Sequence, residues 1–114
     1  MYTKFVASLG ITLKEACIKI QLNDCRGLVL EHNGILHGVL CEGDIIRAFI
    51  NGATPSGLID EYVNVSPLSF LGTDSERTDK FLKLFKKGIT IVPVVDEQKR
   101  ILSIITINGE ISAS

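Results

Sequence analysis

The stretch that decides the fold is GVLCEGDIIR, which runs from Gly38 to Arg47. Its apolar start predicts a strand ending near Cys41, and its polar turn leads to a helix that begins near Asp44. Much of this pattern recurs 65 residues later, in the sequence SIITINGEI of residues 103–111. In both copies, two apolar strands separated by a polar turn come just before it. A repeat of this length predicts two copies of one structural unit.

Each half of the chain is predicted to read helix, strand, turn, strand, helix. Thr12 with Glu15 matches a capping box, and Asn33-Gly34 is typical of a hairpin turn. The last eight residues leave room for barely two helical turns. The predicted helices cover residues 13–22, 44–50 and 77–87, with a helical turn at 58–62; the predicted strands cover 27–30, 35–40, 89–95 and 100–106, with an extended segment at 65–70.

These elements give an α+β fold of two tandem repeats, packed with pseudo-two-fold symmetry around a shared core. The first repeat, with an N-terminal leader, is expected at residues 1–62 and the second at 63–114. The 114 residues suffice for one compact domain or two small subdomains.

Composition narrows the classes of function. The 12 basic and 13 acidic residues give a formal charge of −1 without a basic patch, which argues against nucleic-acid binding. No apolar run is long enough for a membrane span, so no membrane partner is expected. The three cysteines lack zinc-site spacing and suit a reducing cytoplasm.

The pattern resembles the cystathionine-β-synthase (CBS) domain pair, also called a Bateman module, over about residues 8–112. The second copy carries the run GITIVPVVD at 88–96, and the first carries Gly38-Val39-Leu40 followed by Asp44 and Arg47. In such pairs the cleft between the repeats commonly binds adenosine nucleotides. The resemblance therefore implies AMP, ADP or ATP as a regulatory ligand and no catalytic cofactor.

The first copy, by this resemblance, offers Asp44 for the ribose hydroxyls and Arg47 for phosphate. Carboxylates accept charge-assisted hydrogen bonds, and arginine neutralises phosphate well. Cys41 stands where the family usually has serine or threonine, and a thiol is a weaker donor. Leu28 stands where the family often has proline.

The second copy keeps Thr106 and the strand Val92-Pro93-Val94, which is expected to flank a purine ring through main-chain contacts. Ser103 replaces the family glycine, and Gly109 falls where the ribose carboxylate belongs. Glu110 lies one residue late. The first site is therefore expected to be the better preserved of the two.

Local alternatives stand beside these roles. Asp44 is also a good residue for capping a helix, and Arg47 suits a solvated helix face or an ion pair. His32 and His37 flank the hairpin turn as a possible metal pair. Cys41, near a helix N-terminus, is a candidate for a lowered thiol pKa. No side chains form a base-and-orienter arrangement, so no enzyme activity and no catalytic residue are predicted.

Two functions follow from the resemblance. The first is a regulatory adenine-nucleotide module that controls an attached or partner sugar-nucleotide nucleotidyltransferase or a sugar-phosphate isomerase, or that stands alone as a small protein. It is expected to form a homodimer, with the apolar helix face of Ile46, Phe49 and Ile50 as the candidate surface. The second is a dimerisation or docking module that has lost its ligand, which the substitutions at Cys41, Ser103 and Gly109 favour.

Overall fold

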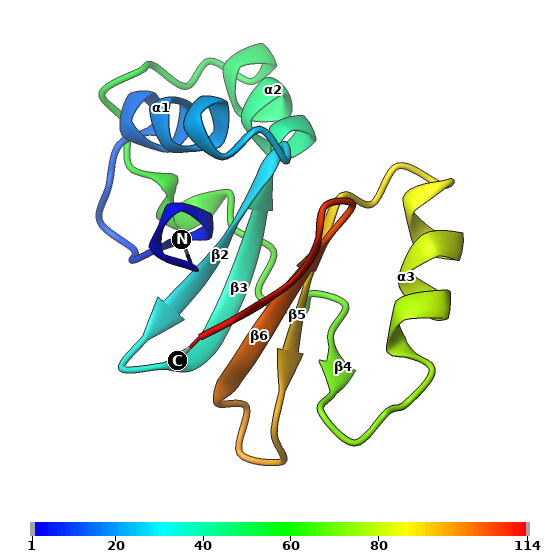
Figure 1. The fold of residues 1–114 in the computed structure, drawn as a ribbon. Helices are drawn as coiled ribbons and strands as arrows, with labels where there is room; N and C mark the ends of the chain where they lie inside the picture. Colours follow the sequence, from blue (N-terminus) through cyan, green and yellow to red (C-terminus); the bar gives the residue numbers. More distant parts are fainter. Residues whose placement is uncertain (1, 114) are drawn as a thin grey trace.

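Residues 2–113 are described by a computed structural model, and they form two small sheets flanked by helices (Figure 1). The strand order is β1-β2-β3 in one sheet and β4-β5-β6-β7 in the other. No helix of these residues has both the length and the apolar character needed to cross a membrane. The α+β class predicted from the sequence is confirmed.

The first sheet joins β1 (Val6–Ala7), β2 (Gly27–His32) and β3 (Ile35–Cys41). β1 runs parallel to β2, and β2 and β3 form an antiparallel hairpin. Asn33 and Gly34 both adopt positive φ at the hairpin turn, as the Asn-Gly pair predicted.

Two helices cover one face of this sheet: α1 (Leu13–Asn23) and α2 (Glu42–Ile50) (Figure 1). The predicted capping box holds the start of α1, since Thr12 and Glu15 exchange side-chain and backbone hydrogen bonds. The apolar residues of the helices and the sheet meet in a buried core, whose largest members are Leu13, Leu28, Leu30, Leu40 and Ile59. Ile59 comes from the short 3-10 helix η2 (Ile59–Glu61), where a helical turn was predicted.

The second sheet contains β4 (Phe70–Leu71), β5 (Ile91–Val95), β6 (Ile101–Thr106) and β7 (Gly109–Ser112). β4 runs parallel to β5, and the other pairs are antiparallel. α3 (Arg77–Phe85) packs on this sheet through Phe81, which is buried with Val92, Val94 and Ile105. Only the end of the predicted extended segment 65–70 is a strand.

The predicted helix after Thr106 is wrong, because the chain turns back there and β7 pairs with β6. Gly109 has a φ of +119° at the turn, which favours glycine, and the Asn108 N–H donates to the Thr106 hydroxyl oxygen over 3.1 Å. The Ser103 hydroxyl then donates to the Glu110 carboxylate over 2.6 Å. Among the described residues, the second repeat thus runs in the order β4, α3, β5, β6 and β7, with a strand where the last helix was predicted.

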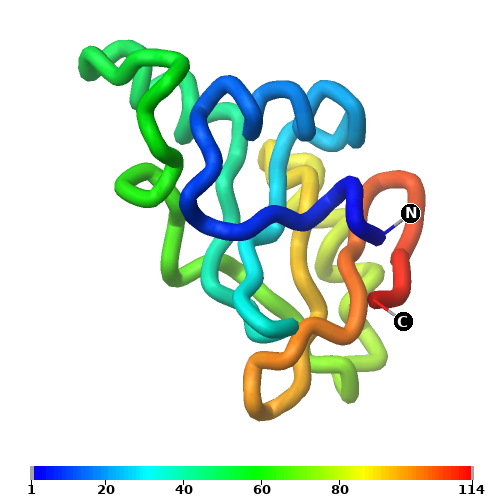
Figure 2. The backbone as a smooth tube through the Cα atoms, turned by 90° about the vertical axis from the view of Figure 1, so that its left-hand side faces the viewer, coloured from blue at the N-terminus to red at the C-terminus, as the bar shows by residue number. Residues whose placement is uncertain are grey.

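The two repeats share a third core, formed by residues of both sheets, of the α1–β2 turn and of the 3-10 helix η1 (Tyr2–Phe5): Phe5, Cys25, Val29, Val39, Ile91, Val95, Ile101 and Ile104. The connecting segment also crosses the first sheet, where Val39 and Asn64 exchange backbone hydrogen bonds of 3.0 and 2.9 Å. Gly38 makes this crossing possible, because a Cβ there would lie 2.5 Å from the Asn64 carbonyl oxygen. In Figure 2 the N-terminal segment crosses the first repeat and ends near the C-terminal segment.

Candidate functional site

Three predicted site residues of the first repeat, Cys41, Asp44 and Arg47, meet at the start of α2. One Asp44 oxygen accepts the Cys41 N–H over 2.8 Å, and the other accepts the Arg47 guanidinium over 2.6 Å. Cys41 is therefore the N-cap, and α2 begins at Glu42, two residues earlier than predicted. Asp44 is therefore not the N-cap that the sequence suggested; it lies at the third helical position and bonds back to the N-cap backbone. The ion-pair alternative for Arg47 is present, and the Arg47 side chain is 68% exposed.

The thiol of Cys41 is not activated by the helix start. Burial raises its pKa to about 11, and the nearby Asp44 carboxylate and Cys25 add to this, while Arg47 opposes it. The suggestion of a lowered pKa is wrong, because desolvation of the thiolate outweighs the helix N-terminus. The thiol remains protonated near neutral pH.

Leu28 and the strand residues of the second repeat lie in the interior. Leu28 belongs to the core under α1 and α2, and Val92 and Val94 pack under α3. Pro93 is also fully buried, at the position equivalent to Leu28. Any contact of these residues with a ligand must therefore come from their main chain, as the sequence implied for the purine.

Thr106 and Glu110 are both engaged within the second repeat. The Thr106 hydroxyl is buried and accepts the Asn108 N–H at the β6–β7 turn. The Glu110 carboxylate receives two bonds from the Arg77 guanidinium, of 3.0 and 3.2 Å, besides that from Ser103. The Arg77 hydrogen bonds hold the pKa of Glu110 below its usual value. This carboxylate ties α3 to β7.

A cavity of about 320 Å³ lies between the two repeats. We call it the cleft. Its lining comes from the α1–β2 turn of the first repeat, from the end of α3, and from residues that follow α3, precede β5 or follow β6 in the second repeat. The lining residues are Asp24, Cys25, Arg26, Phe85, Gly88, Thr90 and Ile107. Small-molecule sites usually have volumes of about 300–1,000 Å³, so this cavity is near the lower end of that range. None of the eight residues predicted from the sequence is among those described residues that line it.

The spacing of the repeat contains information about the cleft that the family motifs do not. Cys25 and Thr90 are equivalent positions of the two repeats, being 65 residues apart, and both line the cleft. Pseudo-two-fold symmetry brings equivalent positions together near its axis. Residue pairs at a spacing of 65 therefore indicate which side chains lie near the cleft.

The cleft lies beside the start of α2. The Glu42 N–H donates to the Arg26 carbonyl oxygen over 2.9 Å, so the backbone of Arg26 is held against the first turn of that helix. Arg26 has a φ of 66°, which is uncommon for a residue other than glycine. Asp24 also has positive φ, as the left-handed cap of α1.

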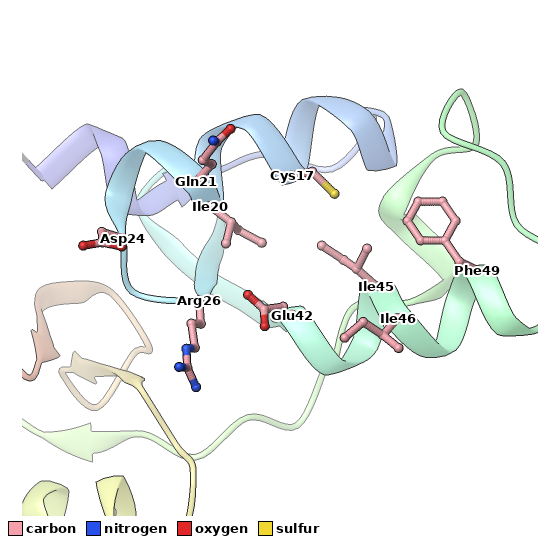
Figure 3. Close-up of a pocket in the computed structure, with 9 residues that line it drawn as sticks. All are labelled: Cys17, Ile20, Gln21, Asp24, Arg26, Glu42, Ile45, Ile46 and Phe49. Carbon is pink, nitrogen blue, oxygen red and sulfur yellow. The ribbon is translucent and has the colours of Figure 1, made fainter.

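A second cavity, of about 480 Å³, separates α1 from α2 (Figure 3). We call it the α1–α2 groove; Ile20 and Cys17 face it from α1, and Ile45, Ile46 and Phe49 line it from α2. Asp24 and Arg26 also line it, but Figure 3 shows their side chains extending away from its apolar residues. Because both residues also line the cleft, they are shared by the two cavities.

The sequence suggested the hairpin histidines His32 and His37 as a metal pair. The His32 ring lies 3.3 Å from the Asn33 amide nitrogen. Within residues 2–113, no group of three or more histidine, cysteine or acidic side chains is arranged to hold a metal ion.

Comparison with known proteins assigns the fold. A family model described as the CBS domain matches residues 1–51. No curated protein matches the chain. Many solved structures do match, and the three reported below each contain an adenosine compound.

The CBS domain pair of protein MJ0100, in complex with 5′-methylthioadenosine and S-adenosyl-L-methionine, has a TM-score of 0.71 and 24% identity, over 90% of this chain and 80% of that one. The CBS domain protein PAE2072 from Pyrobaculum aerophilum, complexed with AMP, has a TM-score of 0.73 and 22% identity. The match covers 90% of this chain and 79% of PAE2072. The cytosolic domain of the Mg²⁺ channel MgtE, in complex with ATP, has a TM-score of 0.66 and 24% identity. The match covers 90% of this chain and 42% of the MgtE chain.

Identities this low establish the fold alone, and the family model adds a sequence match over the first repeat. Residues 1–51 match the CBS domain, and the described chain has the fold of a tandem CBS domain pair.

Proposed function

We propose that this chain is a regulatory module that binds an adenine nucleotide, AMP, ADP or ATP, and has no catalysis of its own. The observation that carries the proposal is the cleft, a cavity of about 320 Å³ between two repeats of a fold that holds adenosine compounds in three solved relatives. The cleft combines an aromatic ring, a hydroxyl and a guanidinium, from Phe85, Thr90 and Arg26.

The purine would lie between the repeats, against the apolar lining and the main chain of the strand that contains Pro93. The ribose and phosphate would extend toward the start of α2. There Asp44 would accept the ribose hydroxyls and Arg47 would contact phosphate, as the sequence resemblance implies. Support comes from the hydrogen bond between Glu42 and Arg26, which holds the start of α2 beside the cleft.

A single site follows from the asymmetry of the two repeats. The equivalent of α2 is absent from the described part of the second repeat, where Gly109 begins β7 instead. Thr106 serves a turn, and the carboxylate of Glu110 is engaged by Arg77 and Ser103. We propose residues 1–62 and 63–114 as the two repeats, with the working site on the first.

The host and assembly are further parts of the proposal. The sequences of residues 35–38 and 42–48 resemble those of pairs fused to sugar-nucleotide nucleotidyltransferases. They favour control of an attached or partner enzyme of this kind, or of a sugar-phosphate isomerase, in the cytoplasm. A homodimer would use the apolar face of α2, where Ile46, Phe49 and Ile50 are 52%, 39% and 76% exposed.

The ligand-free docking module is the second candidate. Two observations favour it: the α1–α2 groove is the larger of the two cavities, and the Asp44 carboxylate is already bonded to Cys41 and Arg47. This candidate predicts a concentration-dependent dimer that does not respond to nucleotides.

Calorimetric titration with AMP, ADP and ATP, with CMP and GMP as controls, separates the two candidates. The nucleotide sensor predicts saturable binding of an adenine nucleotide, weakened about tenfold or more in Asp44→Ala because charge-assisted bonds to the ribose are lost. Asp44→Asn is the matched variant, since its amide oxygen still accepts the Cys41 N–H while the charge is gone. Unchanged affinity in Asp44→Ala would refute the assignment of Asp44.

A further inference from the structure

The charges that line the cleft are few. One guanidinium, Arg26, and one carboxylate, Asp24, are the charged side chains among its described lining residues. Both are exposed, and neither has a hydrogen bond or ion pair within residues 2–113. The remaining lining is apolar or weakly polar, so the two side chains set the electrostatics of the cleft.

Other cations nearby are engaged elsewhere or lie outside the lining. Arg47 is paired with Asp44, and its guanidinium lies over Gly43. The Lys4 ammonium sits 5.4 Å from the centre of the Phe5 ring. Lys86 and Lys87 precede the lining residue Gly88, but both are exposed and neither lines the cleft.

The backbone of Arg26 is fixed at the edge of the cleft that its side chain lines. Its carbonyl is fixed by the Glu42 N–H, and its φ of 66° is a conformation in which arginine is disfavoured. Disfavoured backbone of this kind at a cavity points to a functional requirement for the side chain. Lys99 adopts the same conformation, with a φ of 65°, in the β5–β6 turn and does not line the cleft.

A ligand with one anionic group would satisfy this arrangement. Arginine binds a single phosphate or carboxylate in a two-pronged contact. Further phosphates would meet no second cation among the lining residues, and would be repelled by Asp24 and by Glu42 beside it. The electrostatics therefore oppose a triphosphate.

We propose that the cleft selects an adenosine compound with a single anionic group over a triphosphate, and that Arg26 is the residue that contacts this group. The inference rests on the proposed function, because it assumes that the adenosine moiety binds between the repeats. It differs from the sequence-based assignment in giving the phosphate contact to Arg26 rather than Arg47.

The test is calorimetric titration of the full chain with adenosine, AMP and ATP in magnesium-free buffer, repeated on Arg26→Gln. We expect wild-type chain to bind AMP about tenfold or more tightly than ATP. Arg26→Gln is expected to weaken AMP binding about tenfold and to change adenosine binding by less than about twofold. Lys99→Gln, which removes a charge from the same backbone conformation elsewhere, should alter neither.

The outcomes separate the two levels of the proposal. ATP binding as tightly as AMP, or equal weakening of AMP and adenosine by Arg26→Gln, overturns the charge selection while the adenine site stands. No binding of any adenine compound to folded wild-type chain overturns both. Circular dichroism and thermal unfolding of each variant ensure that a loss of binding is not a loss of fold.

Discussion

Gly38→Ala tests whether the crossing of the connecting segment holds the two repeats together. The new Cβ would lie 2.5 Å from the Asn64 carbonyl oxygen and 2.5 Å from a methyl group of Val63. A contact this short with backbone cannot be relieved by a side-chain rotation. The segment must therefore move away from β3, which breaks the two backbone hydrogen bonds between Val39 and Asn64.

The cost can be worked from these contacts. Each hydrogen bond contributes about 1 kcal/mol, and overpacking of a tight site costs about 1–3 kcal/mol. The expected loss is about 3 kcal/mol of unfolding free energy, a large share of the ~5–15 kcal/mol of a typical domain. For a chain of this size, this corresponds to a fall in Tm of about 12 °C.

Thermal and urea unfolding followed by circular dichroism measure this loss. Gly43→Ala is the matched control, because its Cβ would meet only the flexible Arg47 guanidinium, at 3.4 Å, and alanine favours a helix. The control should keep or raise the Tm. A Gly38→Ala chain as stable as wild type would show that the crossing contributes little, and would refute the reasoning.

Three further predictions concern single side chains. Asn23→Ala removes an amide that bonds three backbone groups in the interior, so urea unfolding should show a loss of about 3 kcal/mol; a loss under about 1 kcal/mol would contradict the reasoning. Glu110→Gln breaks the charged contact with Arg77, and the lowered pKa of Glu110 means that this stabilisation is present at neutral pH and lost as pH falls through that pKa. The variant should therefore lose stability at neutral pH and approach wild type in acid; equal stability at every pH would count against it. The pKa of Cys41 is raised to about 11, so between about pH 9 and 11 the folded chain keeps the thiol proton while the unfolded chain loses it. The free energy of unfolding should therefore fall with rising pH in this range, and more steeply in wild type than in Cys41→Ser. Parallel curves for the two chains would show that this thiol does not contribute.

The sequence predicted the repeat and most of the elements because the signals were local. The capping box at Thr12 and Glu15, the Asn33-Gly34 turn and the apolar strands each depend on neighbouring residues. The recurrence of the pattern at a spacing of 65 residues then identified the two units as copies. Local signals of this kind need no knowledge of tertiary contacts.

The end of the second repeat was mispredicted because the deciding contacts are not local. Symmetry with α2 suggested a helix, whereas Glu110 pairs with Ser103 across the hairpin and with Arg77 from α3. The substitutions that looked like decay of a nucleotide site have a structural reason: Gly109 supplies the positive φ of the turn, and Ser103 supplies a hydroxyl for β7.

The candidate site was only partly accessible from sequence for a similar reason. The meeting of Asp44 with Arg47 follows from helix spacing and was expected. The cleft, in contrast, brings Arg26 from one repeat near Thr90 from the other, and depends on how the two sheets pack. A family motif points to the strands and helix starts and does not name the turn between α1 and β2.

Amide NMR spectra of the chain titrated with AMP test the central claim most directly. Binding between the repeats predicts saturable shifts of residues that line the cleft in both repeats, such as Arg26, Gly88 and Thr90, together with Asp44 at the start of α2. Residues of the β5–β6 turn, such as Gln98, should not move. Absent shifts, or shifts confined to the α1–α2 groove, would contradict nucleotide binding in the cleft.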